Sequence, residues 1–376
     1  MPFIKKTVME QKQEFIALLD KGLTMTELCL RFSISRKTGY KWKKRYLDEG
    51  VLGLRDRSRR PKESPNKTSQ RIEELVVILR KNDPDWGGKK IHKILERDYG
   101  HKNLPSVTTI NNILKRNGLI NPINSEKSKN FQSFEYELPN QLWQMDFKGD
   151  FMMLNQKRCF PLTIIDDHSR YNICLDALPN QQYSSVQKHL KVVFKKYGRP
   201  QTILCDNGNP WGMSGLKKDE GRLTKLEKWL MKIDIRMIHG RAYHPQTQGK
   251  LERYHRTLKL ELLSKNRFKN IPHSQLYFKE WKNKYNHYRP HESLDLNVPA
   301  KRYVPSQRSY TDILLKPEYL DSDTKRKVDK RGLISFKGNS IRVGKALGGE
   351  YVAVRPKNKR EFAIYFMWKE IKTIHL

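Results

Sequence analysis

The length and charge of the chain limit what it can be. It has 376 residues, more than one hydrophobic core usually holds, so several domains are expected. Its 75 Lys and Arg residues outnumber its 40 Asp and Glu residues, and a net charge of +35 repels itself in a compact monomer unless a polyanion is the normal partner. Nucleic acid is the commonest such polyanion, and a ribosomal or membrane surface is the alternative.

The sequence shows no pattern typical of secretion or membrane insertion. No run approaches the about 18 apolar residues of a membrane span, and the N-terminus lacks the apolar core of a signal peptide. The four cysteines have no paired spacing, which is typical of reduced, buried side chains; they are Cys29, Cys159, Cys174 and Cys205. We therefore expect a cytoplasmic, nucleoid-associated protein.

Residues 9–48 have the pattern of three short helices. Thr24 and Glu27 form a capping box at the start of the second helix, and Ser35 can cap the third after a tight turn. This order predicts a helix-turn-helix DNA-binding domain over residues 1–52, with a small solvated helical bundle as the alternative. In such domains the start of the last helix reaches base edges while flanking cations hold phosphates. The candidates for DNA contact are Arg36, Lys37, Tyr40, Lys41 and Lys44.

Two polar linkers frame a second helical segment. Residues 53–68 have too few apolar groups to fold alone, and Arg59 and Arg60 beside Pro61 either enter a narrow minor groove or belong to a flexible cationic tether. Apolar periodicity over residues 69–120, with Ser106 as a cap, predicts a second helical DNA-binding domain. A Lys-rich linker over residues 121–138 follows.

The hydrophobic period changes after residue 139. Apolar runs of strand length come first and helices are interleaved afterwards, which predicts a mixed α/β domain over residues 139–305. Alternating apolar and polar residues return over residues 306–376, with a hairpin signal at Lys337 and Gly338. This last segment predicts a small, basic β-barrel that contacts phosphates.

Three acids in the α/β segment are candidates for chemistry. Asp146 lies inside an apolar strand pattern, where a charge is costly to bury unless it is paired or binds a cation. Asp206 follows a short strand, and Glu252 lies in a helix start otherwise rich in cations. Carboxylates can hold two divalent metals about 4 Å apart, the arrangement that assists attack at a phosphodiester. Taken singly, these acids also fit an exposed strand edge, an ordinary turn and an i,i+4 pair with Arg256.

The sequence around these acids resembles that of bacterial insertion-sequence DDE transposases, whose catalytic core is like that of retroviral integrases. The matching segments are WQMDF at 143–147, DDHSR at 166–170, CDNG at 205–208, HPQTQGKLER at 244–253, YNHYRPHESL at 285–294 and PAKRY at 299–303. Lys259, the basic residue seven positions after Glu252, also matches. The resemblance extends over the helix-turn-helix segments and the α/β domain.

The resemblance implies a ribonuclease-H-like core in which Asp146, Asp206 and Glu252 are catalytic and hold two Mg²⁺ or Mn²⁺ ions. It also implies that Arg256 and Lys259, on the same helical face as Glu252, contact DNA phosphates beside the metals. Water would nick one strand at the terminal inverted repeats of the mobile element, and the freed 3′-hydroxyl would attack target DNA without a covalent protein intermediate. Two ends must be held together, which implies a dimer or larger synaptic complex.

Other polar and aromatic residues are assigned structural roles. Asp166 and Asp167 match the family at a strand end and are expected to be turn acids, while Glu227 is expected to be solvated. Trp143 and Trp281 are expected to anchor the core rather than stack on bases.

The sequence departs from the family in two respects and leaves two other functions open. Forty-five residues separate Asp206 from Glu252, more than is usual in the family, and no His-His-Cys-Cys zinc module precedes the core. The extra residues leave both acids on their own elements, so we expect activity to be retained. The alternatives are a catalytically idle DNA-binding regulator derived from a transposase, and a nuclease acting on RNA hybrids. Tandem helix-turn-helix segments favour duplex DNA, because a helix enters the major groove of B-DNA better than that of A-form duplexes.

Overall fold

The computed structural model describes most of the chain. The described residues are 6–58, 68–100, 104–120, 135–208, 210–211, 223–240 and 249–376. They form two compact units, Met1–Lys67 and Thr68–Leu376, each of which is considered by itself. Within the described residues, no helix is both long and apolar enough to span a membrane. Cys29, Cys159, Cys174 and Cys205 are buried, free thiols, as predicted.

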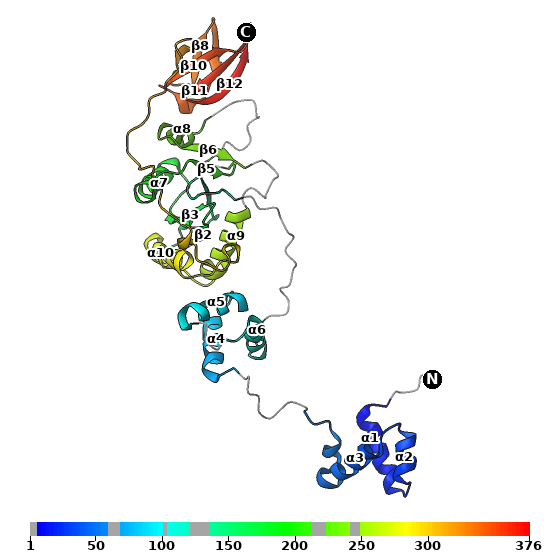
Figure 1. The fold of residues 1–376 in the computed structure, drawn as a ribbon. Helices are drawn as coiled ribbons and strands as arrows, with labels where there is room; N and C mark the ends of the chain where they lie inside the picture. Colours follow the sequence, from blue (N-terminus) through cyan, green and yellow to red (C-terminus); the bar gives the residue numbers. More distant parts are fainter. Residues whose placement is uncertain are drawn as a thin grey trace. The chain divides into compact units, whose positions relative to one another are not determined.

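The first unit is built from three helices. They are α1 (Val8–Asp20), α2 (Met25–Arg31) and α3 (Arg36–Glu49) (Figure 1). Thr24 and Glu27 form the predicted capping box at the start of α2, each side chain bonding to the other's backbone N–H. Ser35 caps α3 by accepting a hydrogen bond from the backbone N–H of Thr38 at 3.2 Å. The predicted helix-turn-helix plan is confirmed.

Gly39 allows the three helices of this unit to pack closely. It is buried on α3, and an added Cβ would lie 2.7 Å from Sδ of Met25, 2.8 Å from Sγ of Cys29 and 3.1 Å from the ring of Phe15. The fully buried Phe15 ring in turn makes edge contacts with Phe32 and Trp42. The face of α3 that contains Gly39 is therefore fixed against the other helices.

The second unit begins with another set of three helices. These are α4 (Gln70–Asn82), α5 (Gly88–Tyr99) and α6 (Val107–Arg116). Their apolar faces meet around the buried side chains of Trp86, Ile91 and Ile110. Ser106 caps α6 as predicted, accepting from the backbone N–H of Thr109 at 3.2 Å.

A mixed sheet lies at the centre of the second unit. Its strands are β1 (Leu142–Phe147), β2 (Phe151–Met152), β3 (Arg158–Asp166), β4 (Asn172–Leu178), β5 (Thr202–Cys205) and β6 (Arg236–His239). The described strands follow the order β2-β3-β1-β5-β6, and β4 pairs with β3. β1 is antiparallel to β3 and parallel to β5, and β5 is parallel to β6. The central strand β1 is thus hydrogen-bonded on both sides.

Helices cover both faces of this sheet. α7 (Tyr183–Tyr197) and α8 (Lys225–Lys232) share a core with Cys174 and Leu178 of β4, whereas α9 (Gly249–Leu258) and α10 (Ile271–His287) share another with Leu175 and Ala177. Successive residues of a strand point to opposite faces, so β4 contributes to both cores. Trp143 and Trp281 are buried in these cores, as predicted. The three layers confirm the predicted α/β domain, which has the topology of a ribonuclease-H-like core.

The C-terminal segment contains two small antiparallel sheets. Its strands are β7 (Thr324–Lys327), β8 (Leu333–Phe336), β9 (Asn339–Arg342), β10 (Tyr351–Pro356), β11 (Glu361–Phe366) and β12 (Lys369–His375). Four pair in the order β12-β11-β10-β7, and β8 pairs with β9 through the predicted turn at Lys337 and Gly338. The prediction of a closed barrel is not confirmed, because across residues 306–376 the recorded pairings leave β12 and β7 as free edges and the β8–β9 hairpin as a separate sheet.

Helix α8 contributes side chains to two cores. Leu226, Trp229 and Leu230 pack with the central sheet, whereas Met231 packs with the C-terminal strands. Glu227 on the same helix is only 3% exposed and pairs with Lys369 of β12, so the prediction that it is solvated is wrong. Its burial follows from the C-terminal sheet, which covers the face of α8 that points away from the central sheet.

Candidate active site and DNA-contact surface

Two of the three predicted catalytic acids lie side by side on the central sheet. Asp146 is on β1, and Asp206 immediately follows β5. The parallel register pairs Trp143 with Ile203 and Gln144 with Leu204, so its continuation by two residues places Asp146 beside Asp206. The carboxyl ends of adjacent parallel strands thus bring together two acids that are 60 residues apart in the chain.

The two carboxylates interact electrostatically. Burial and, to a smaller extent, the neighbouring charge of Asp206 together raise the pKa of Asp146 from its ordinary value of 3.8 to about 6. One oxygen of Asp146 accepts the backbone N–H of Phe147 at 2.7 Å, and the Trp211 side chain also hydrogen-bonds to this carboxyl. Phe147 stacks on Trp211 with ring centroids 5.3 Å apart. These donors and the positive charge of Lys148 lower the pKa of Asp146, but they do not offset burial and the charge of Asp206.

The loop after β5 is shaped around Asp206. The backbone N–H of Gly208 donates to Asp206 Oδ1 at 2.9 Å, and an added Cβ at Gly208 would lie 3.1 Å from Oδ2. The ring of His239 bonds to the backbone carbonyl of Asp206 at 2.8 Å. These contacts fix the Asp-Asn-Gly turn, in which Asp206 is partly exposed.

Glu252 is not brought into a metal-holding cluster with these two acids. It lies in the first turn of α9 and is exposed, as are Arg256 and Lys259 further along. Lys259 begins a π-helical turn that ends at Leu263. Across the described part of the chain, no three His, Cys, Asp or Glu side chains are grouped so that they can hold a metal ion. The structure thus assembles a pair of acids, and the role of Glu252 as third ligand stays a prediction.

Buried polar contacts fix α9 against the sheet on both sides of Glu252. Lys250 pairs with the fully buried Asp167 at 2.6 Å. His255 bonds through Nε2 to Oγ1 of Thr163 at 2.8 Å. No role was predicted for Thr163 or His255, because nothing in the sequence indicates that a strand residue and a helix residue 92 positions apart meet.

Asp166 and Asp167 have the structural roles predicted for them. Asp166 accepts hydrogen bonds from the backbone N–H of Asn140 and from the side chain and backbone of Ser169, which closes the turn after β3. Asp167 accepts from the side chain of Gln144 at 2.7 Å in addition to pairing with Lys250. Both aspartates are fully buried and committed to these partners.

The predicted DNA-contact residues of the first unit lie on the exposed face of α3. All five are exposed: Arg36, Lys37, Tyr40, Lys41 and Lys44. Lys37, Lys41 and Lys44 lie on the side of α3 opposite Gly39, whose face is packed against α1 and α2. Arg36 lies one turn before Gly39 and Tyr40 directly follows it, so these two side chains flank the packed face. The packed side of α3 is thus separate from a cationic side that is free to enter a groove. Arg59 and Arg60, predicted to contact DNA from the linker, lie outside the described residues.

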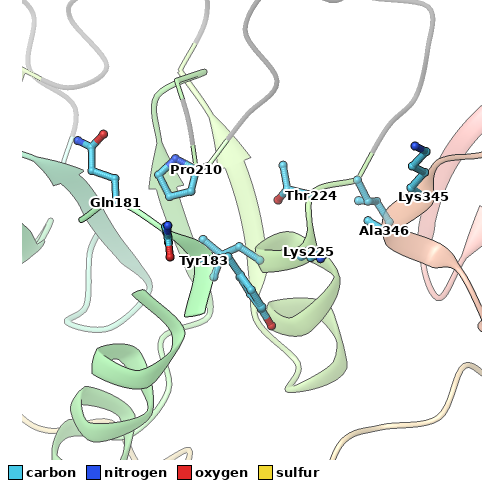
Figure 2. Close-up of a pocket in the computed structure, with 10 residues that line it drawn as sticks. Gln181, Tyr183, Pro210, Thr224, Lys225, Lys345 and Ala346 are labelled. Carbon is cyan, nitrogen blue, oxygen red and sulfur yellow. The ribbon is translucent and has the colours of Figure 1, made fainter. Parts of the chain in front are cut away.

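A cavity of about 490 Å³ lies away from the acid pair (Figure 2). The starts of α7 and α8 form much of its wall, with Lys225 from α8 and Lys345 from the C-terminal segment. Neither Asp146 nor Asp206 lines it. The acid pair lies instead at the carboxyl ends of β1 and β5, where Asp146 and Asp206 are both partly exposed.

Comparison with protein families gives matches along most of the chain. Models of an integrase core domain match residues 137–245 and 233–299. A helix-turn-helix domain matches residues 11–62, and a homeodomain-like domain matches residues 38–114. The C-terminal domain of IS481 family transposases matches residues 323–376.

Curated relatives include proteins of bacterial mobile elements. A 31.7 kDa protein of insertion element IS407 from Burkholderia multivorans is 22% identical over 256 residues, covering 66% of this chain and 86% of that protein. The transposase for transposon Tn552 from Staphylococcus aureus is 25% identical over 382 residues, covering 89% of this chain and 76% of that protein.

Solved structures with a resemblance include two retroviral complexes. One is the intasome of simian T-cell lymphotropic virus with a PP2A regulatory subunit, with 17% identity, a TM-score of 0.38, and 81% of this chain and 99% of that chain covered. The other is the HTLV-2 integrase catalytic core with magnesium, with 15% identity, a TM-score of 0.32, and 44% and 97% covered. Scores this low add nothing to the assignment.

The α/β fold, the helix-turn-helix unit and the matched family models define a DNA-binding protein with an integrase core, of the polynucleotidyl transferase type. Within that class, the matched models and the relatives support an insertion-sequence DDE transposase.

Proposed function

We propose that this transposase binds the terminal inverted repeats of its mobile element and catalyses metal-dependent cleavage and strand transfer of DNA. The observation that carries the proposal is the close pair of Asp146 and Asp206 at the ends of adjacent parallel strands. Burial and, to a smaller extent, the neighbouring charge of Asp206 raise the pKa of Asp146 to about 6, and a bound cation would offset this cost of ionising the pair.

The donor set fits Mg²⁺ or Mn²⁺. Both ions prefer oxygen ligands, and Mg²⁺ in particular keeps several waters, so a few carboxylates complete the protein's share of such a site. Asp146 and Asp206 would together bind one of the two ions, and Glu252 on α9 would complete the set of protein ligands. When bound, the two ions supply positive charge at the phosphate and a deprotonated attacking oxygen.

The chain's own residues would hold and orient the DNA. Arg256 and Lys259 are exposed at one and two turns beyond Glu252, where they can bind phosphates on either side of the scissile bond. The cationic face of α3 would read the inverted repeat, and the transferred 3′-hydroxyl would be aligned by the same phosphate contacts. Each protomer supplies one such site, so joining two element ends requires a dimer or larger synaptic complex.

The test is cleavage of a plasmid with the inverted repeats. We expect the full-length protein to nick supercoiled plasmid and join ends in Mg²⁺ but not in EDTA. Asp146→Asn, Asp206→Asn and Glu252→Gln should each reduce both reactions to background while leaving binding of a repeat-containing duplex unchanged. Asp150→Asn is the matched control, because Asp150 undergoes the same chemical change but pairs with Arg158 on the surface.

Two outcomes would overturn the proposal. Full strand transfer by Glu252→Gln in Mg²⁺ would exclude Glu252 as a ligand. A wild-type protein that binds the repeat equally with Mg²⁺ and EDTA, and leaves the plasmid intact, would instead be a DNA-binding regulator.

A further inference from the structure

A chain of two hydrogen bonds connects α9 to the backbone of Asp146. Thr163 lies directly opposite Asp146 in the β1–β3 register and is fully buried. Its hydroxyl donates to the backbone carbonyl of Asp146 at 2.7 Å, and the same oxygen lies 2.8 Å from Nε2 of His255. One threonine thus contacts both the strand that bears Asp146 and the helix that bears Glu252.

The direction of these bonds is fixed by chemistry. A carbonyl oxygen only accepts, so the single hydroxyl proton of Thr163 is committed to Asp146. The Thr163 oxygen must then accept from His255, which requires a proton on Nε2. Burial and, to a smaller extent, Lys148 lower the pKa of His255 to about 3, so the ring is neutral and has its one proton on Nε2.

The position of His255 on the helix gives this contact its significance. Residues three apart lie on the same helical face, so His255 and Glu252 are neighbours one turn apart. Lys250, two residues before Glu252, is held by the buried carboxylate of Asp167 at 2.6 Å. The turn that contains Glu252 is therefore anchored at both ends, and its C-terminal anchor leads directly to Asp146.

We propose that Thr163 and His255 are positioning residues that set the distance between the Glu252 turn and Asp146 before any metal binds. The inference rests on the proposed function, since it concerns the third ligand of that site. On this proposal, the protein itself places α9 relative to Asp146 and Asp206, and the metal ions are not needed for that placement. Hydrogen-bond partners behind metal ligands commonly contribute 10–100-fold to metal affinity or activity, about 1.4–2.7 kcal/mol.

The experiment uses pairs of substitutions that keep or remove one hydrogen bond. His255→Gln keeps an N–H near the Nε2 position, whereas His255→Asn places its N–H near Nδ1, too short to reach Thr163. Thr163→Ser keeps the hydroxyl, whereas Thr163→Val removes it at nearly constant volume. Thr257→Val is the matched control, because the Thr257 hydroxyl bonds only within α9, to the carbonyl of Arg253 at 3.0 Å.

Binding of Mn²⁺ to the full-length protein, measured by electron paramagnetic resonance, is the first readout. We expect Thr163→Val and His255→Asn to weaken Mn²⁺ binding about 10–100-fold. His255→Gln, Thr163→Ser and Thr257→Val should bind nearly as the wild type does. All five variants should keep a cooperative melting transition of the α/β domain and an unchanged affinity for the repeat duplex, which separates positioning from a general loss of structure.

The second readout is the protonation of the His255 ring, observed by nuclear magnetic resonance on protein with ¹⁵N-labelled histidine. The signal of His255 is identified as the one that is missing from the spectrum of His255→Gln. In the wild type, this signal should show a proton on Nε2 and none on Nδ1. A proton on Nδ1, or Mn²⁺ binding by Thr163→Val as tight as that of Thr257→Val, would refute the positioning role. The protonation readout needs neither metal nor DNA. If the expected Mn²⁺ affinities and the expected His255 protonation are both observed but DNA is not cleaved, only the proposed function is refuted.

Discussion

Replacing Asp146 by Asn should stabilise the metal-free protein while abolishing its chemistry. The folded carboxyl keeps its proton up to about pH 6, whereas the unfolded carboxyl loses it near pH 3.8. The folded state therefore binds more protons between these values, and its stability falls as the pH rises through this window. Above pH 6 the full cost of the ionised carboxylate is present, and Asn, which is never charged, avoids it.

The size of the effect follows from the shift in pKa. A rise of about two units corresponds to about 3 kcal/mol at about 1.4 kcal/mol per unit. Asp146 is partly exposed, and solvent screening reduces this to about 1–3 kcal/mol. Asn keeps an oxygen that can accept the N–H of Phe147, so the substitution removes the charge without removing that hydrogen bond.

Differential scanning calorimetry in EDTA measures this effect, because it separates the transitions of the different units of a multidomain chain. At pH 7.5 the α/β transition of Asp146→Asn should lie above that of the wild type, and the gap should narrow at pH 5. Adding Mg²⁺ should raise the wild-type transition and leave that of Asp146→Asn in place. Asp150→Asn should show no gain at either pH.

A variant that is equally or less stable than the wild type at pH 7.5 in EDTA would refute the reasoning. It would show that Asp146 is already neutralised by the protein and that the acid pair does not require a cation.

Three further predictions concern other parts of the chain. Gly39→Ala should destabilise the first unit by about 1–3 kcal/mol and weaken DNA binding, because the added methyl group would lie 2.7 Å from Sδ of Met25. Calorimetry and a gel-shift titration measure the two effects, and an unchanged melting transition of the first unit would contradict the prediction. Lys44→Ala should lower the slope of log affinity against log salt concentration by about 1, measured by fluorescence anisotropy on the repeat duplex. A plot parallel to that of the wild type would exclude Lys44 as a phosphate contact. Arg289→Ala should cost about 3–5 kcal/mol, because it leaves the buried carboxylate of Glu261, 2.7 Å from the Arg289 Nε atom, without its cationic partner. Calorimetry should show recovery of this stability in a Glu261→Gln, Arg289→Met double variant.

Local signals in the sequence were sufficient to predict the helices, whereas the acid pair also required the resemblance to a known family. Thr24, Ser35 and Ser106 cap the helices that their spacing predicts, since a cap depends only on the next three residues. Asp146 and Asp206 were candidates because a charge within or just after an apolar strand is costly to bury, but each also fits an exposed edge or an ordinary turn. The resemblance of the flanking segments to those of transposases was needed to select them.

Features that depend on contacts between distant segments were not predictable. The strands of the C-terminal segment were recognised, but barrel closure depends on which edges pair, and alternation within a strand does not encode this. Glu227 is charged and follows the helical pattern of a surface residue, yet β12 covers it. The contact between Thr163 and His255 escaped prediction for the same reason, since neither residue is unusual in its own segment.

The double-sided packing of α8 limits how the chain can be divided. A fragment that ended at residue 305 would keep α8 but expose Met231 and leave Glu227 without Lys369. It would also lose the hydrogen bonds by which Arg308 and Leu315 fasten the following segment to the α/β domain. Recombination that replaced only the last 71 residues would therefore join mismatched surfaces, so this helix and the C-terminal sheets are expected to be inherited and exchanged together.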